Sequence, residues 1–408
     1  MSVPSAPVAP DPVPPVLEVD HLRVAYPDHR SGHAPGTPVQ TVRDVSFTVA
    51  EGEALGVVGE SGCGKSQTML AVLGLLGPEG AEITGKITFD GRDLTALGRR
   101  QWREVRGSGI ALISQDALSA LNPAMTIGAQ MAEPLVRYDG HGRRAARARC
   151  EELLDLVGIP APRDRLGSHP HELSGGMRQR VLIAMAVSRE PRLLIADEPT
   201  TALDVTLQSQ VLGLIDRLRR ELGTALVLIT HDLGVVAQVT DRIAVMYGGR
   251  IVETAPTTAL FDAPGHPYTR ALMAAVPRLD RQVDRLPAIP GFPPHPADPP
   301  PGCAFQPRCA TARADCADAV PALLPLPGTA RPDHTGHDAG HEAGHDTGHD
   351  TGHDAGHDTG HDAGHDTGHD AGHDTGHHTG QHVHTVRCPY PALTALTDDE
   401  PHPAGAPV

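Results

Sequence analysis

The segment GESGCGKS, at Gly59–Ser66, carries the most specific chemical signal in the chain. It fits the pattern G-x-x-x-x-G-K-[ST] and lies between an apolar strand-like run, Ala54–Val58, and a helix-like run, Thr68–Leu76. Glycines at this spacing let backbone N–H groups surround phosphate oxygens, while Lys65 reaches the β- and γ-phosphates and Ser66 ligates Mg²⁺. The pattern predicts a nucleoside-triphosphate site, with an ordinary glycine-rich turn as the alternative.

The loop is expected to bind phosphate chiefly through its backbone N–H groups. We assign to the nucleotide the residues Gly59, Glu60, Ser61, Gly62, Cys63, Gly64, Lys65, Ser66 and Gln67. Cys63 could act as a nucleophile, but no base is evident nearby in the sequence. We therefore interpret it as filling a tolerant position.

An acidic pair lies within LLIADEPTTALD, at residues 193–204. The apolar run predicts a strand that delivers Asp197 and Glu198 at its carboxyl end, where α/β sheets place ligands. Asp197 is suited to hold Mg²⁺ directly or through water, and Glu198 to orient or deprotonate the attacking water. An isolated Asp-Glu pair is most simply a solvated strand end. Its place some 130 residues after the phosphate loop favours the catalytic interpretation.

A third motif, ELSGGMRQRVLIAMAV, spans Glu172–Val187 and places Ser174, Gly175 and Gly176 just ahead of a helix-like run. Such a helix start offers N–H groups to a phosphate. With the other motifs in the same order, the chain resembles the ATPase subunits of ABC transporters, whose signature segment reads LSGGQ. The resemblance spans roughly residues 16–330. Met177 departs from the usual Gln, and LSGGM resembles the oligopeptide/dipeptide/nickel importer branch.

The resemblance implies roles for other residues. Tyr26 would stack on adenine, although a tyrosine at the edge of the core remains the alternative. Gln115 would sense Mg²⁺ and the γ-phosphate, Asp204 would signal across a dimer, and His231 would contact the γ-phosphate as a switch. The segment 116–123 is where the family contacts its membrane subunits.

The resemblance also implies a composite site. The phosphate loop of one subunit and residues 174–176 of another would enclose one ATP, so the monomer is expected to be nearly inactive. The implied fold is α/β: a P-loop NTPase of the ABC type with a RecA-like core, an antiparallel β subdomain, a helical subdomain and a C-terminal extension.

The pattern of apolar runs is that of an α/β core. Strand-like runs occur at residues 17–25, 42–49, 54–58, 86–89, 110–113, 193–196 and 225–229; 126–159 is mainly helical, a helix at 206–222 makes a βαβ-like unit, and 242–253 resembles a hairpin. We divide the chain into a disordered Pro-rich N-terminus at 1–15, an ATPase domain at 16–265, an extension with a Cys cluster at 266–330, a disordered His/Asp/Gly insertion at 331–385, and the end of the extension with a tail at 386–408.

Charge is spread unevenly over the 408 residues, whose formal net charge is −16. Residues 331–408 hold 14 acidic and 2 basic side chains, so residues 1–330 carry a net charge of only −4. This near-neutral part shows no nucleic-acid footprint. No apolar run approaches the roughly 20 residues needed to cross a bilayer, and the N-terminus lacks the features of a signal peptide. We therefore expect the chain to lie on the cytoplasmic face of the cell membrane, held there by partners.

Four cysteines mark the C-terminal third. After HPYTRALMAAVP, at His266–Pro277, Cys303, Cys309 and Cys316 follow in a C-x5-C-x6-C spacing, and Cys388 comes after the repeat. This region resembles the extension of the oligopeptide/dipeptide branch. In some relatives the four thiolates hold a [4Fe–4S] cluster. Zinc and four unmodified thiols are the alternatives.

A true repeat, GHDAGHDT with small variations, occupies residues 334–382, and histidine recurs at every fourth position from 337 to 377. Its frequent Gly makes a stable helix unfavourable and predicts a disordered loop. Imidazole suits Ni²⁺, Zn²⁺ and Cu²⁺. A replication-slippage expansion with no selected role and a pH response of the 16 histidines in residues 331–408 are the alternatives.

The leading hypothesis is the ATP-hydrolysing subunit of an importer of peptides or nickel-type cargo. Its partners would be a second ATPase subunit, in a homo- or heterodimer, transmembrane permease subunits and, indirectly, a solute-binding protein. The rival hypotheses are an ABC ATPase that moves no solute and a metal-buffering protein acting through its His-rich tail.

Overall fold

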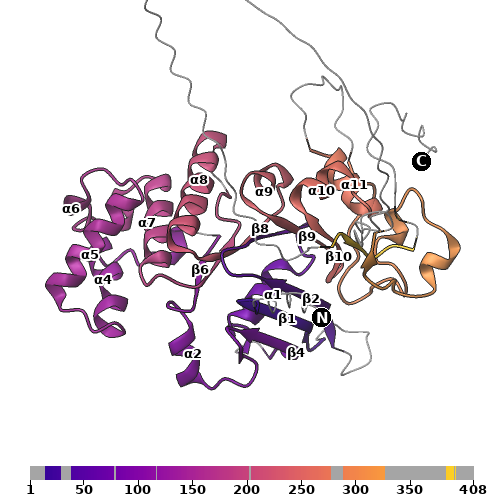
Figure 1. Ribbon diagram of the computed structural model, residues 1–408, viewed down its shortest axis with the longest axis horizontal. Coiled ribbons are helices and arrows are strands. Elements are labelled where there is room, and N and C mark those ends of the chain that lie inside the picture. The colour runs from indigo at the N-terminus through magenta and orange to yellow at the C-terminus, as the bar shows by residue number, and fades with distance from the viewer. Residues whose placement is uncertain are drawn as a thin grey trace, which may run out of the picture. The chain divides into compact units, whose positions relative to one another are not determined.

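The computed structural model describes residues 14–28, 38–77, 80–115, 117–201, 204–276, 288–326, 383–389 and 391. Most of the Pro-rich N-terminus and the whole His-rich repeat lie outside these residues, so the predictions made for them stay predictions. The described strands form two sheets, one of four strands and one of eight (Figure 1).

The smaller sheet is antiparallel, in the order β2-β1-β4-β5. Its strands are β1 (Leu17–Tyr26), β2 (Val39–Val49), β4 (Glu82–Phe89) and β5 (Arg92–Asp93). In β1 and β2 buried apolar residues alternate with exposed ones, as expected of a sheet with one face on the core. This is the antiparallel subdomain expected from the sequence.

The larger sheet has the order β11-β12-β10-β9-β3-β8-β7-β6, and its five strands from β9 to β6 are parallel. Its elements are β3 (Ala54–Val58), β6 (Ile110–Ile113), β7 (Leu193–Asp197), β8 (Ala225–Thr230), β9 (Arg242–Tyr247), β10 (Arg250–Pro256), β11 (Leu324–Pro325) and β12 (Thr385–Val386). The central strands read as continuous apolar runs because both faces of the sheet are covered.

Successive residues of β7 pack against different layers, one on each face of the large sheet. Leu194 packs with the helical side, whereas Leu193 and Ile195 pack with the antiparallel sheet. Figure 1 shows α8 (Val205–Leu222) and α9 (Leu233–Val239) on one side of the sheet, and α1 (Lys65–Val72) with the small sheet on the other. The remaining α-helices are α2 (Arg99–Val105), α3 (Ala117–Ala120), α4 (Ile127–Arg137), α5 (Arg143–Leu156), α6 (Pro162–Arg165), α7 (Gly175–Val187), α10 (Thr257–Asp262) and α11 (Pro267–Ala274).

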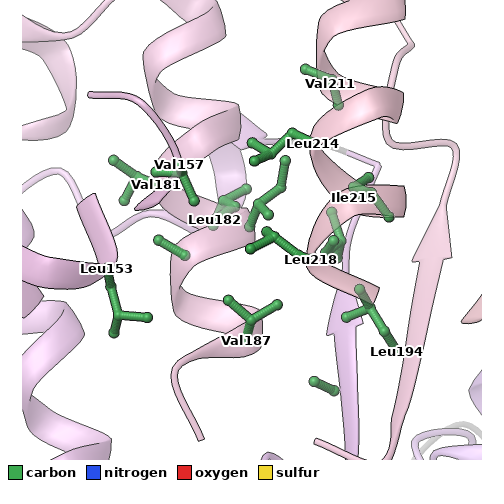
Figure 2. Packing of buried hydrophobic residues seen from close by; sticks show 14 of the residues in the cluster. Leu153, Val157, Val181, Leu182, Val187, Leu194, Val211, Leu214, Ile215 and Leu218 are labelled. Atoms are coloured by element: carbon green, nitrogen blue, oxygen red, sulfur yellow. The ribbon is translucent and has the colours of Figure 1, made fainter. Parts of the chain in front are cut away.

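The helical subdomain and the sheet share one hydrophobic core. Leu153 of α5, Leu182 of α7, Leu214 of α8 and Leu194 of β7 meet there, and all are buried (Figure 2). This packing joins the helix that follows the LSGGM segment to the strand that ends in the acidic pair.

Several predicted elements are confirmed. β7, α8 and β8 form the βαβ unit, and β9 and β10 form the hairpin, with Gly248 and Gly249 at positive φ in its turn. Residues 126–159 fold into α4 and α5. The helix after the phosphate loop starts at Lys65 rather than Thr68, because Gly64, at φ 104°, turns the chain directly into it.

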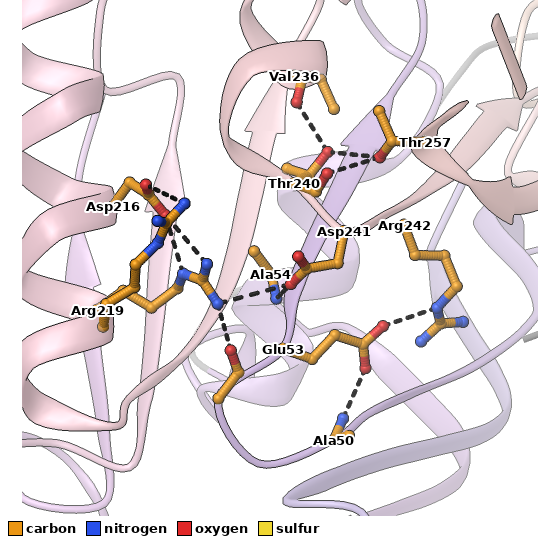
Figure 3. A network of polar contacts seen from close by, with 12 residues as sticks. Ala50, Glu53, Ala54, Asp216, Arg219, Val236, Thr240, Asp241, Arg242 and Thr257 are labelled. Atoms are coloured by element: carbon orange, nitrogen blue, oxygen red, sulfur yellow. Dashed lines mark hydrogen bonds and ion pairs between the residues drawn. The ribbon is translucent and has the colours of Figure 1, made fainter. Parts of the chain in front are cut away.

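A polar network lies at the amino ends of the parallel strands (Figure 3). Glu53, which precedes β3, pairs with Arg242 of β9 at 2.8 Å between carboxylate and guanidinium, and both side chains are buried. Asp241 accepts a hydrogen bond from the Ala54 N–H at 2.7 Å and pairs with Arg219 of α8. These contacts fix the amino ends of neighbouring strands relative to one another.

The chain on either side of the His-rich repeat comes together in the large sheet. β12 pairs antiparallel with both β11 and β10, so the strand after the repeat lies beside the strand before it. His384 is buried and Thr385 begins β12. The predicted disordered insertion, 331–385, therefore extends a few residues too far at its end, because Glu253 of β10 holds His384 at 2.6 Å.

Candidate functional site

The phosphate loop joins β3 to α1 in a conformation that requires glycine. Gly62 and Gly64 lie at φ 79° and 104°. A Cβ on Gly64 would meet the Thr41 carbonyl at 2.7 Å. The Lys65 ammonium, almost fully buried, donates to the carbonyls of Gly59 at 2.7 Å and Glu60 at 3.0 Å. The loop thus curls around the ammonium group of its own lysine.

Ser66 and Asp197 meet although 131 residues separate them in the chain. The Ser66 hydroxyl donates to an Asp197 carboxylate oxygen at 3.2 Å. Burial raises the pKa of Asp197, the adjacent Glu198 carboxylate adds to this shift, and the Ser66 hydrogen bond opposes it. A hydroxyl and a half-buried carboxylate side by side are ligands of the kind that Mg²⁺ takes beside phosphate oxygens.

Glu198 lies at the centre of the predicted catalytic residues. Its carboxylate accepts hydrogen bonds from the Gln115 amide at 3.1 Å and the Thr201 hydroxyl at 2.9 Å, and His231 Nδ1 lies 3.3 Å away. Its backbone is left-handed, at φ 46°, because the chain turns sharply at the end of β7. The Glu198 N–H remains bonded to the Ile229 carbonyl of β8 at 2.9 Å. Three strand ends therefore bring Glu198, Gln115 and His231 together.

Tyr26 at the end of β1 is half-buried, and its hydroxyl donates to the Gln67 side chain of α1. The adenine-stacking role predicted for Tyr26 stays a prediction. Cys63 is buried, and burial raises the pKa of its thiol, although Lys65 opposes this shift. A protonated buried thiol fits a packing role rather than that of a nucleophile.

Ser174 and Asp204 are helix caps. The Ser174 hydroxyl accepts from the Met177 N–H at 3.3 Å at the start of α7, and Asp204 accepts from the Leu207 N–H at 2.9 Å at the start of α8. Within the described part of the chain, no hydrogen bond links Ser174, Gly175 or Gly176 to the phosphate loop. One copy of the chain thus presents the loop and the LSGGM segment separately.

Two contacts at the site were not predicted. The Gln179 amide of α7 donates to the Pro199 carbonyl at 2.8 Å, which ties the LSGGM helix to the segment after Glu198. Glu60 is held by Arg308 and Tyr268 from the C-terminal extension. No periodicity or local spacing marks partners that lie 20 to 248 residues apart.

The four C-terminal cysteines all line one pocket. Burial raises the pKa of Cys303, and Cys309 and Cys316 contribute to the shift. The pocket is lined by His266, Pro267, Cys303, Phe305, Gln306, Cys309, Thr311, Cys316, Cys388 and Pro389. Across the described ranges, however, no set of three or more His, Cys, Asp or Glu residues is arranged to hold a metal ion. Among the described residues no disulfide joins these cysteines, and the four thiols that line the pocket are not in ligating positions.

A phosphate loop after the central parallel strand β3, with an acidic pair at the end of β7, two strands away in the same sheet, defines a P-loop ATPase. Residues 42–201 match the ABC transporter family, and residues 252–316 match the oligopeptide/dipeptide transporter C-terminal region. The chain belongs to the ABC transporter ATPases, and it carries the C-terminal region of their oligopeptide/dipeptide branch. Its substrate is ATP and its cofactor is Mg²⁺.

Relatives and solved structures agree. The chain is 49% identical to the dipeptide transport ATP-binding protein DppD of Bacillus subtilis over 72% of its own length and 86% of the relative's. It is 46% identical to the oligopeptide transport ATP-binding protein OppD of Salmonella typhimurium over 79% of its own length and 94% of the relative's. A dimer of the ATP-binding cassette MJ0796 bound to ADP and phosphate is similar at 27% identity and a TM-score of 0.51, covering 59% of this chain and 98% of that one. The ABC-type fold predicted from the sequence is confirmed.

None of the helices in the described ranges is both long and apolar enough to cross a membrane.

Proposed function

We propose that the chain is the ATP-hydrolysing subunit of an importer of dipeptides or oligopeptides. The observation that carries the proposal is the pairing, in one chain, of a complete ATPase site with the oligopeptide/dipeptide C-terminal region. Relatives named for dipeptide and oligopeptide transport are 46 to 49% identical to the chain over more than 70% of its length. That combination disfavours an ABC ATPase without a transport role.

The geometry of the site supports a separate role for each of its residues in ATP binding and hydrolysis. Lys65 would hold the β- and γ-phosphates, while Ser66 and Asp197 would hold Mg²⁺, which neutralises phosphate charge when bound. Glu198 would take a proton from the attacking water, because its carboxylate is fixed at the end of β7. Gln115 and His231 both lie beside Glu198. They would contact the γ-phosphate and so link its presence to the position of the base.

The ATP site is proposed to close only between two subunits. Ser174–Gly176 start α7, where helix N–H groups favour a phosphate, yet they are not joined to the phosphate loop of their own chain. The solved dimer of the related cassette MJ0796 supports a pair of such subunits. The residues predicted to touch the permease begin at Asp116, which lies outside the described residues, and continue to Pro123.

Reconstitution with the permease subunits, the second ATPase subunit and the solute-binding protein would test this proposal. We expect ATP hydrolysis in vesicles to rise when the solute-binding protein is loaded with a dipeptide or oligopeptide, and the chain to bind the vesicles only when the permease is present. Stimulation by Ni²⁺ complexes but not by peptides would replace the peptide cargo with a nickel-type one. Hydrolysis indifferent to every solute would favour a non-transport ATPase.

The cysteine pocket is a second candidate site. We propose that its four thiols are the ligand set of a [4Fe–4S] cluster, with zinc and free thiols as the competing results. The lining of one pocket by all four supports the proposal, although the described positions would have to rearrange to ligate. Iron, sulfide and zinc analysis of anaerobically purified protein separates the three results.

The His-rich repeat could still bind Ni²⁺ or Zn²⁺, which would make metal buffering a further function of the chain. Deleting residues 334–382 tests this, because β11 and β12 on either side of the deletion already pair. Unchanged transport and ATPase activity would make the repeat accessory. Absence of binding at micromolar Ni²⁺ and Zn²⁺ would remove the metal hypothesis.

A further inference from the structure

The C-terminal extension contacts the phosphate loop directly at Glu60. The Glu60 N–H donates to the Tyr268 hydroxyl of α11 at 2.9 Å. The Glu60 carboxylate accepts two hydrogen bonds from the Arg308 guanidinium, at 2.6 and 3.0 Å. Bidentate, charge-assisted pairs of this kind are among the stronger and more directional contacts in proteins.

Arg308 is itself held in place from several sides. Its Nε donates to the Pro290 carbonyl at 2.7 Å, and its Nη1 lies 3.1 Å from the Tyr247 hydroxyl. The side chain is only 5% exposed, and its guanidinium lies 5.8 Å from the centre of the Tyr247 ring. The hydrogen bonds to Glu60 raise the pKa of Arg308 beyond its already high ordinary value. The guanidinium is therefore a fixed charge, not a mobile surface one.

The aromatic residues behind this contact make the support rigid. Tyr247, Tyr268 and Phe305 pack with ring centres 4.5 to 5.3 Å apart, and all three are buried. Phe305 and Tyr268, the latter on α11, belong to the extension, whereas Tyr247 lies on β9 of the ATPase core. The extension is thus anchored to the core at the point where it reaches the phosphate loop.

Glu60 connects this support to the catalytic lysine. Its carbonyl accepts from the Lys65 ammonium at 3.0 Å, while its side chain and N–H are held by the extension. A shift of Glu60 would move the first turn of the loop and the lysine with it. Preorganised N–H groups and charges bind phosphate better because they need not be reordered when the ligand arrives.

We propose that Arg308 and Tyr268 are positioning residues for ATP: they hold Glu60 so that the phosphate loop is preformed, and the extension thereby sets the affinity of the nucleotide site. The inference rests on the nucleotide site described above. It gives the extension a part in ATP binding that is independent of any metal in the cysteine pocket.

Titration of the purified full-length chain with a fluorescent ATP analogue tests the proposal. In a Glu198→Gln background, which prevents turnover, we expect Arg308→Ala to weaken ATP binding about 10- to 100-fold. Tyr268→Phe removes only the hydroxyl and leaves the ring, so we expect a smaller loss of about 3- to 10-fold. Arg308→Lys keeps the positive charge but cannot donate two parallel hydrogen bonds to Glu60. Its affinity for ATP should therefore lie between those of Arg308→Ala and the unsubstituted chain.

Arg270→Ala is the matched control, because Arg270 also lies on α11 and its side chain makes no hydrogen bond or ion pair with the described residues. It should bind ATP as the unsubstituted chain does. The double variant Glu60→Ala/Arg308→Ala should lose little more than either single variant, because both remove the same contact.

A purely structural role would lower the unfolding temperature of the folded variants while leaving ATP affinity unchanged, and that result would overturn the proposal. If the unsubstituted chain itself failed to bind ATP, the nucleotide site rather than the positioning role would be wrong. Equal affinity of Tyr268→Phe and Arg308→Lys with the unsubstituted chain would also overturn the proposal, even if Arg308→Ala does not fold.

Discussion

The charged side chains at the amino ends of the parallel strands are arranged differently from those at the carboxyl ends. At the amino ends, Glu53 and Arg242 are buried and paired at 2.8 Å, and Glu53 also accepts from the Ala50 N–H at 2.7 Å (Figure 3). At the carboxyl ends, Asp197 is desolvated beside another carboxylate, and Glu198 sits in a left-handed backbone. At the amino end the buried carboxylate is paired with a guanidinium. At the carboxyl end the two adjacent carboxylates accept hydrogen bonds from Ser66, Gln115 and Thr201, and no arginine among the described residues pairs with them.

The difference follows from what each end must do. A buried ion pair with additional hydrogen bonds is satisfied without any ligand and fixes the strands relative to one another. Burial disfavours the charged form of Asp197 and is the main cause of its raised pKa, and the adjacent Glu198 carboxylate adds to this cost. A bound Mg²⁺ would remove that cost. The residues that stabilise the fold therefore lie at the amino ends of the strands, and the residues proposed to act in hydrolysis lie at the carboxyl ends.

The largest expected effect is on hydrolysis, at the carboxyl end. Glu198→Gln should lower kcat for ATP by about 10²- to 10⁴-fold, because it removes the proposed base while keeping the shape of the side chain. ATP binding should be retained. Steady-state hydrolysis by the reconstituted complex and nucleotide titration of the purified chain measure the two quantities.

Glu51→Gln is the control for this substitution, because Glu51 is an exposed carboxylate near the amino end that pairs with Arg192. Its kcat should equal that of the unsubstituted chain. Activity near this level in Glu198→Gln would assign the proton acceptor to another group.

The next effect is on stability, at the amino end. Glu53→Gln leaves Arg242 buried without its carboxylate, so the free energy of unfolding should fall by about 3 kcal/mol. Glu51→Gln again serves as control, and its loss should stay below about 1 kcal/mol because its ion pair is exposed. Urea unfolding measures both. ATP affinity of the folded Glu53→Gln protein should not change, and a large loss of affinity would contradict the separation of the two ends.

The smallest expected change in stability, at Asp197, has the opposite sign. Asp197→Asn should abolish Mg²⁺-dependent hydrolysis yet raise the free energy of unfolding of the nucleotide-free chain by about 1 kcal/mol at neutral pH. The pKa of Asp197 is raised in the folded state, so its contribution is favourable at low pH and is lost as pH rises through the folded pKa. The gain of the variant should therefore shrink toward pH 4. Thermal unfolding at both pH values checks this, and a variant less stable than the original at neutral pH would refute it.

Much of the core could be predicted from the sequence because its signals are local. The phosphate loop, the strand that ends in Asp197 and the hairpin turn at Gly248 each depend on residues adjacent in the chain. The helix start at Lys65 was missed by three residues, because apolar periodicity begins only at Thr68, whereas the glycine at 64 already turns the backbone. The end of the insertion was missed because His384 is fixed by Glu253, 131 residues away.

The sequence by itself determined the family, the parallel sheet and the residue types that handle phosphate and Mg²⁺, because short motifs constrain backbone conformation and chemistry locally. Only the tertiary structure decided which of these groups meet. The Ser66–Asp197 and Gln115–Glu198 contacts arise because parallel strands bring their carboxyl ends to one edge. The contact of Arg308 with Glu60 arises because the extension folds back over β9, which no local pattern encodes.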